Sequence, residues 1–226
     1  MPDNRLTLAN LREHFRKNIA IYIAGIAVML VLSSLLWTAT TPRIPTDQTV
    51  VIYLASSYFD ADALSPIADD VLERTQAFDD TLRRVEFQGL QFADSEDDYT
   101  SNILLMTRLS VHEGDVFLAS AAAMDALVNA GGAMPLDSFL EAGWLSEYGL
   151  EPYTVTEEDE ETGARRTYVA GLRLDSVDAL SELGAFNNRD AFLVLSETSD
   201  NPETARKAVE FLLDDLTRDT AEEGSP

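Results

Sequence analysis

Hydroxyl side chains follow two apolar runs in this chain, and they are its clearest candidates for binding a small polar ligand. Ser56, Ser57 and Tyr58 come directly after the run V-V-I-Y-L-A, and Ser120 follows the run D-V-F-L-A. If both runs are parallel strands, their carboxyl ends lie at the edge of the sheet where open α/β sheets bind ligands. The alternative interpretation is that the four residues cap helices and form turns.

Residue types that support known catalytic mechanisms are scarce. The chain has two histidines, His14 and His112, and it has no cysteine. We expect His112 to lie at the surface, and no G-x-S-x-G, H-E-x-x-H or P-loop spacing occurs. The sequence therefore predicts neither an enzyme nor a bound cofactor. A hydrolase that uses Asp or Glu is an alternative, supported only by the abundance of carboxylates.

Two acidic runs carry the oxygen ligands that calcium prefers. They are D-S-E-D-D at residues 94–98 and E-E-D-E-E at residues 157–161. Neither run has the glycine spacing of an EF-hand loop. We therefore expect solvated loops at both places and no metal site.

One uncharged stretch, residues 18–41, is long enough to cross a bilayer as a helix, which needs about 20 mostly apolar residues. Arg16 and Lys17 adjoin it on the amino side, whereas only Arg43 is close on the other side. Lys and Arg next to a span favour the cytoplasmic side. We therefore expect a single-pass anchor in the cell membrane, with residues 1–17 in the cytoplasm and the remainder extracytoplasmic.

Two alternatives to an anchor are a cleaved signal peptide and a buried core helix. A signal peptide has a shorter apolar region and a small residue three positions before the cut, where cleavage after Ala39 would place Trp37. A soluble helix of this length would show a polar face. The tail before the span, with Leu8, Leu11 and Phe15 at helical spacing, is either an amphipathic helix on the inner leaflet or an ordinary basic tail.

Charge and composition restrict the partners of the remaining chain. From residue 42 onward there are 12 basic and 38 acidic residues, a formal charge of −26. Such a surface repels nucleic acid and anionic head groups, so we expect no nucleic-acid partner. The lack of cysteine excludes disulfides and a lipid attached to cysteine, which leaves the apolar helix as the membrane anchor.

The sequence predicts one extracytoplasmic domain over residues 50–218, preceded by an extended linker at 42–49 and followed by a disordered tail at 219–226. Strands are expected at 50–55, 82–92, 115–119 and 191–195, with a hairpin within 153–174. Helices are expected at 63–78, after the acidic run 94–98, at 120–129, at 177–183 and from Pro202 onward. We expect Ile103, Leu104, Met106, Leu109 and Val111 to form the buried face of the second of these helices. Alternation of strands and helices favours an α/β fold with a mostly parallel sheet flanked by helices.

Two stretches resemble the extracellular solute-binding proteins of bacterial ABC importers. The first is G-D-V-F-L-A-S-A-A-A-M-D-A-L-V-N-A-G-G-A-M-P-L-D-S-F-L, from Gly114 to Leu140, similar to a strand and helix followed by A-G-x-x-x-P-L-D. The second is F-L-V-L-S-E-T-S-D-N-P-E-T-A-R-K-A-V-E-F-L-L, from Phe192 to Leu213, similar to the segment that returns to the first lobe. The resemblance implies a periplasmic-binding-protein-like lobe.

The resemblance also implies that the second lobe of that family is missing. About 50 residues separate Asp137 from the strand near Phe192, whereas a lobe needs roughly 100 residues of its own. Because the family binds its ligand between two lobes, no ligand-binding residue carries over. We expect a binding or interaction module, an accessory subunit of a transport-related membrane complex whose partner is a membrane protein such as a transporter subunit. The alternative is a reduced solute receptor that completes its cleft by dimerising or by docking on a permease.

Overall fold

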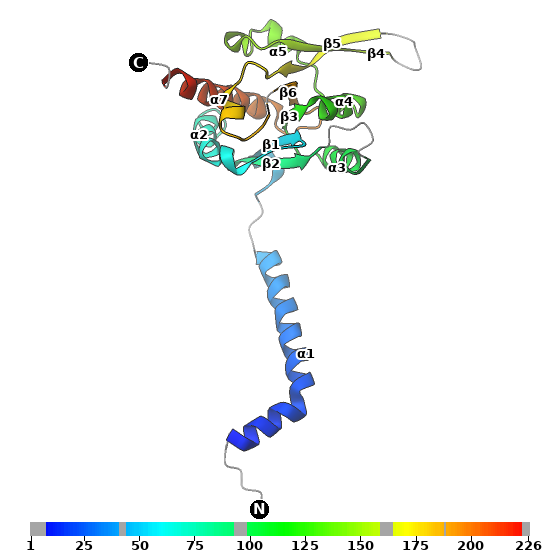
Figure 1. Cartoon of the computed structure of the whole chain (residues 1–226), viewed down its shortest axis with the longest axis vertical. Coiled ribbons are helices and arrows are strands. Elements are labelled where there is room, and N and C mark those ends of the chain that lie inside the picture. Colours follow the sequence, from blue (N-terminus) through cyan, green and yellow to red (C-terminus); the bar gives the residue numbers. More distant parts are fainter. Residues whose placement is uncertain (1–7, 41–43, 93–98, 159–164, 188, 223–226) are drawn as a thin grey trace, which may run out of the picture. The chain divides into compact units, whose positions relative to one another are not determined.

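The computed structural model describes residues 8–40, 44–92, 99–158, 165–187 and 189–222 (Figure 1). The chain divides into two compact units, Met1–Arg43 and Ile44–Pro226. The first unit is helical, and the second is an α/β domain. Ile44 already belongs to the second unit, and a 3-10 helix at Thr46–Gln48 precedes the first strand. Part of the segment expected as an extended linker, 42–49, is therefore folded into the domain.

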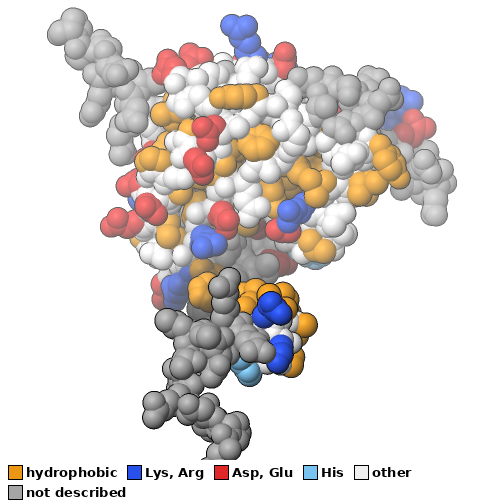
Figure 2. Space-filling model, turned by 60° about the horizontal axis from the view of Figure 1, so that its bottom comes forward, with side chains coloured by type: hydrophobic (Ala, Val, Ile, Leu, Met, Phe, Trp, Pro, Cys, Tyr) orange, Lys and Arg blue, Asp and Glu red, His pale blue; other side chains and the backbone are white. Residues whose placement is uncertain are grey.

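The first unit contains one long helix, α1 (Leu8–Thr40), with a bend at Asn18. Its segment Arg16–Trp37 is long and apolar enough to cross a membrane and has no buried residue. Figure 2 shows hydrophobic side chains on this helix, with Lys and Arg side chains beside them. An amino-terminal helix with these properties is compatible with a single-pass anchor and with a signal sequence.

The second unit is built on a six-stranded sheet with the strand order β2-β1-β3-β6-β5-β4. β1 is parallel to β2 and β3, whereas the pairs β3–β6, β6–β5 and β5–β4 are antiparallel. The α/β class is confirmed, but the expectation of a mostly parallel sheet is wrong, because the sheet is mixed. The strands are β1 (Thr49–Ser56), β2 (Arg84–Gln91), β3 (Val116–Ser120), β4 (Pro152–Glu158), β5 (Arg165–Arg173) and β6 (Ala191–Leu195).

Strand direction follows from the length of each connection. β1 to β2 and β2 to β3 are joined through helices, and such crossovers return the chain in the same direction. β4 and β5 form the expected hairpin, whose short connection requires antiparallel strands. Its tip, with residues 159–161 of the second acidic run, lies outside the described residues, as does the first acidic run.

Helices cover both faces of the sheet (Figure 1). Alternate residues of β1 divide between two cores: Ile52 and Leu54 join the core under α2 and α7, and Tyr53 and Ala55 join the core under α3 and α4. This alternation is what a sheet buried on both faces requires. The helices are α2 (Ser65–Gln76), α3 (Tyr99–Ser110), α4 (Ala121–Asn129), α5 (Asp137–Glu141), α6 (Ala179–Glu182) and α7 (Pro202–Glu222), with further 3-10 turns at Asp62–Leu64 and Ser146–Tyr148.

Two helices differ from expectation. α7 begins at Pro202 as expected and buries Ala205, Val209, Leu212 and Leu216, but it continues to Glu222, so residues 219–222 are helical where we expected a disordered tail. α3 buries Ser101, Leu105 and Leu109. The predicted buried face was therefore wrong for four residues, which are exposed by 47%, 39%, 51% and 59%: Ile103, Leu104, Met106 and Val111.

Candidate ligand-binding site and interaction surface

A polar cavity of about 360 Å³ opens at the carboxyl ends of β1 and β3. Its volume is at the lower end of the range for small-molecule sites, about 300–1,000 Å³. The lining comes from the end of β1, the start of α4 and the loop before β6, and consists of Ser56, Ser57, residues 120–122, Asn187, Arg189 and Asp190. Three of the four residues singled out in the sequence therefore surround one cavity.

The hydroxyls at the end of β1 lie in different surroundings. Ser56 is buried, and its Oγ accepts a hydrogen bond from the backbone N–H of Tyr58 at 3.4 Å. The carbonyl oxygen of Ser57 accepts from Nε2 of Gln91 at 3.1 Å. Tyr58 itself is 60% exposed and does not line the cavity. The two interpretations of this segment, ligand binding and turn formation, do not exclude one another, because Ser56 takes part in a turn and also lines the cavity.

Ser120 has the geometry of a helix cap. Its backbone is extended (φ −65°, ψ 167°), and its Oγ accepts a hydrogen bond from the N–H of Ala123 at 3.5 Å. Ala121 and Ala122 of the first turn of α4 also line the cavity, and N–H groups in the first turn of a helix can donate to an oxygen of a bound molecule. Whether Ser56, Ser57, Tyr58 and Ser120 bind a ligand stays a prediction.

The loop before β6 brings charge to the cavity. Asp190 accepts a hydrogen bond from Nη2 of Arg173 at 3.1 Å, and the backbone N–H of Asp190 donates to Asp175 at 2.9 Å. The hydrogen bond from Arg173 also lowers the pKa of Asp175. Arg173 and Asp175 lie outside the lining, so the charged side chains of the cavity are Arg189 and Asp190, and the lining is formally neutral. Such a site suits a small polar molecule that is neutral or zwitterionic.

Sequence reasoning missed Asn187, Arg189 and Asp190 because it did not fix the direction of β6. In the antiparallel pair, Ser120 lies opposite Ala191, so the residues just before β6 lie at the carboxyl end of β3. A parallel β6 would place them at the opposite edge of the sheet. The polar sequence N-N-R-D before an apolar strand was the available signal, and its use required knowing the strand direction.

A second candidate surface is an uncharged apolar stripe on α3. Tyr99, Ile103 and Met106 are 75%, 47% and 51% exposed. Their spacing of four and three places them on one side of the helix. Arg108 is the one charged residue of this helix, and it pairs with Glu113. We call Tyr99, Ile103 and Met106 the α3 stripe; exposed apolar side chains that share one side of a helix are a candidate surface for contact with another molecule.

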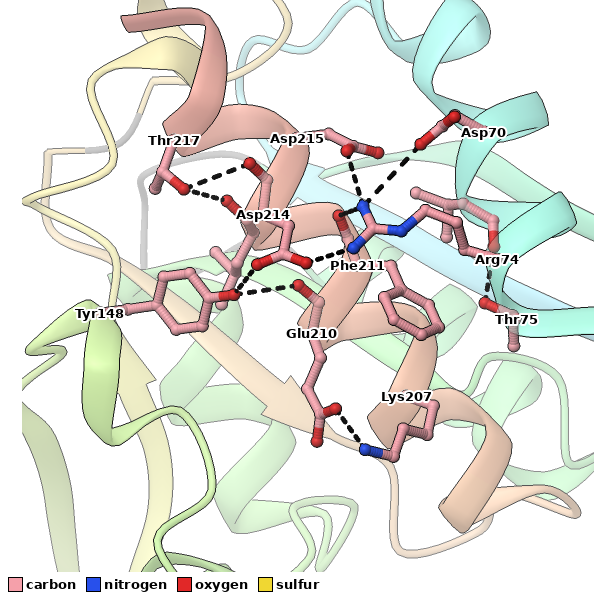
Figure 3. Close-up of polar contacts among 12 residues, drawn as sticks. Asp70, Arg74, Thr75, Tyr148, Lys207, Glu210, Phe211, Asp214, Asp215 and Thr217 are labelled. Atoms are coloured by element: carbon pink, nitrogen blue, oxygen red, sulfur yellow. Dashed lines mark hydrogen bonds and ion pairs between the residues drawn. The ribbon is translucent and has the colours of Figure 1, made fainter. Parts of the chain in front are cut away.

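A third cluster, around Arg74, is structural (Figure 3). Arg74 of α2 donates to Asp214 and, at 2.8 Å, to Asp215 of α7, and its guanidinium lies 4.4 Å from the ring centre of Phe211. Tyr148 donates to Asp214 from the 3-10 turn, and burial raises its pKa. Because these carboxylates accept hydrogen bonds from side chains of neighbouring elements, the cluster joins α2, α7 and the turn at Ser146–Tyr148.

Within the described parts of the chain, no group of three or more His, Asp or Glu residues is placed to hold a metal ion. His112 is at the surface as expected, 3.4 Å from Asp200. Comparisons with protein-family profiles, with curated protein sequences and with solved structures gave no match. The function is therefore inferred from the sequence and the structure of this chain alone.

Proposed function

We propose that this chain is a membrane-anchored extracytoplasmic interaction module, an accessory subunit of a transport-related membrane complex. The observation that carries the proposal is the α3 stripe. Three large apolar side chains lie exposed on one helix of a domain that is strongly acidic, in a chain whose formal charge from residue 42 onward is −26. Burying them against a partner would remove apolar surface from water, a gain of about 25 cal/mol per Å².

Membrane anchoring rests on the segment Arg16–Trp37, which is apolar, long enough to span and flanked by Arg16 and Lys17. The basic flank assigns the amino-terminal side to the cytoplasm and the α/β domain to the outside. We assign the segment as a retained anchor and not as a cleaved signal. A tethered domain meets its partners in the plane of the membrane, which is where a transporter subunit lies.

The chemistry of the stripe and of the domain indicates the kind of partner. An apolar surface is needed opposite Tyr99, Ile103 and Met106, and basic residues around it would complement the acidic domain. We therefore propose an integral membrane protein whose extracytoplasmic surface is apolar and rimmed by Lys or Arg. A second copy of this chain is disfavoured as the partner, because two chains that each carry a formal charge of −26 from residue 42 onward repel one another.

The resemblance to solute-binding proteins gives the proposal its link to transport. That resemblance rests on sequence patterns. It implies that the chain returns to the first lobe at the strand near Phe192. The pairing of β6 with β3 in one sheet is compatible with this expectation. The hairpin β4–β5 occupies the place where a second lobe would begin.

The test is recovery of the partner from membranes with the full-length chain. A photo-crosslinking amino acid at position 103 is expected to capture an integral membrane protein at an extracytoplasmic surface with basic residues. The double variant Ile103→Ser/Met106→Ser is expected to lose that protein, whereas Phe78→Ser, which alters an exposed apolar residue (53%) away from α3, retains it. A chain that elutes alone in mild detergent, or that crosslinks to its own copy, overturns the proposal.

The polar cavity favours a second function, that of a reduced solute receptor. A ligand that binds the folded state raises the unfolding temperature by mass action. Screening sugars, amino acids and short peptides by thermal shift is expected to give a concentration-dependent rise that Arg189→Gln weakens. Tyr58→Phe is the matched control because Tyr58 lies outside the lining. The receptor function is rejected if no compound class shifts the transition.

A further inference from the structure

The bend at Asn18 divides α1 into a short arm, residues 8–17, and the apolar span (Figure 1). Asn18 has φ −114° and ψ 15°, outside the helical region, whereas the residues on both sides are helical. A straight helix would carry the arm about 15 Å away from the end of the span, at 1.5 Å per residue. The bend instead turns the arm away from the axis of the span.

Side chains on both sides of the bend stabilise it. Nδ2 of Asn18 donates to the carbonyl oxygen of His14 at 3.0 Å and lies 3.2 Å from Nδ1 of the same residue. The ring of His14 packs edge-on against Tyr22, with 6.2 Å between ring centres. A side chain that bonds to the helix carbonyl in this way is a known cause of a kink. The bend is therefore built into the sequence at the junction of the arm and the span.

The sequence of the arm has an apolar face with cations along one edge. Leu8, Leu11 and Phe15, at spacings of three and four, share one face of a helix, and Arg12 and Arg16 come next to them around it. An apolar face with cations beside it is the pattern of a helix that lies in the plane of a membrane interface.

We infer that residues 8–17 lie flat on the cytoplasmic leaflet and bind anionic phospholipid. The inference rests on the proposed membrane anchoring. Leu8, Leu11 and Phe15 enter the boundary of the acyl chains, and Arg12 and Arg16 contact lipid phosphates. Two observations select a lipid surface as the occupant: the arm continues directly from the span, and its cations complement anionic head groups. The bend is what allows the arm and the span to meet the bilayer together.

The absence of native cysteine makes the test direct, because a single introduced cysteine carries the only label. The full-length protein is placed in nanodiscs with or without about 30% anionic phospholipid, a range in which each surface cation contributes to binding. A polarity-sensitive fluorophore is attached at Leu11→Cys, on the apolar face, or at Ala9→Cys, on the other side of the arm. With anionic lipid, the label at position 11 is expected to emit at shorter wavelength and to resist aqueous iodide, whereas the label at position 9 is quenched.

Control variants separate failure of this inference from failure of the anchor. A label at Met29→Cys, within the span, reports membrane insertion. If that label is buried in lipid while positions 9 and 11 are quenched equally, the inference about the arm is wrong and the anchor stands. If the label at position 29 is quenched, the anchor itself is wrong. Protection of position 11 that is unchanged without anionic lipid, or in Arg12→Gln/Arg16→Gln, overturns the assignment of anionic phospholipid.

Discussion

At the scale of single residues, Asp115 connects three strands of the domain. It is buried at the start of β3, where one carboxylate oxygen accepts from the N–H of Val51 in β1 at 2.8 Å. The other oxygen accepts from Oγ of Ser199, after β6, at 2.6 Å. Burial raises the pKa of this carboxyl group, and the hydrogen bonds from Ser199 and Val51 oppose the rise.

The first prediction concerns this pKa. Carbon-detected NMR titration is expected to place the Asp115 pKa above its ordinary value of about 3.9. Ser199→Ala is expected to raise the pKa further, because it removes a hydrogen bond that favours the charged form. Since the folded pKa exceeds the unfolded one, the contribution of Asp115 to stability is greatest below the unfolded pKa and decreases as pH rises through the folded value. A lower pKa in Ser199→Ala would contradict the assignment.

At the scale of elements, α3 shows what a sequence pattern leaves open. Its twelve residues, Y-T-S-N-I-L-L-M-T-R-L-S, contain apolar side chains around much of the helix, so periodicity does not select one face. The packing of α3 against the sheet determines which face of the helix is buried. Ser101 is buried at that contact because its Oγ donates to the carbonyl oxygen of Gln91 at the end of β2. No hydropathy pattern places a serine in a core.

The second prediction compares two neighbouring residues of this helix. Leu105→Ala is expected to lower the free energy of unfolding by about 2–5 kcal/mol, because Leu105 is buried and its removal leaves a cavity. Ile103→Ala is expected to change it by no more than about 0.5 kcal/mol, since that side chain is half exposed. Urea denaturation of the isolated variants measures both. Equal decreases in the free energy of unfolding would mean that Ile103 packs in the core and would contradict the α3 stripe as an exposed surface.

In the rest of the fold, too, some features depend on the local sequence and others on contacts between distant segments. The strands and most helices could be predicted, because buried strands are short apolar runs and helices repeat at their own period. Strand order and the direction of β6 could not, since they depend on partners far away in the sequence. The candidate cavity was half predictable for this reason: Ser56, Ser57 and Ser120 follow recognisable strands, whereas Asn187 and Arg189 reach the cavity through the antiparallel β6.

At the scale of the whole molecule, the dominant quantity is the formal charge of −26 carried by the chain from residue 42 onward. Acidic side chains are spread over the visible face of the domain in Figure 2. Uniform charge of this size keeps a domain soluble, and its self-repulsion opposes the compact state. Ion pairs such as those of Arg74 offset part of this repulsion locally.

The third prediction follows from this repulsion. Raising sodium chloride from about 10 mM to 150 mM shortens the screening length from about 30 Å to 8 Å. The unfolding temperature of the domain is therefore expected to rise with salt over this range, as measured by circular dichroism. A matched series in glycerol controls for general solvent effects. An unfolding temperature that falls with added salt would mean that attractive ion pairs outweigh the repulsion.

The strand order β2-β1-β3-β6-β5-β4 also determines how copies of this domain avoid aggregation. The two outer strands, β2 and β4, expose backbone groups that could pair with a strand of another molecule. β4 begins with Pro152 and ends with Glu157 and Glu158, and β2 carries Arg84 and Glu86. Proline lacks the N–H that a new strand would use, and the charges resist burial. These features oppose growth by edge pairing.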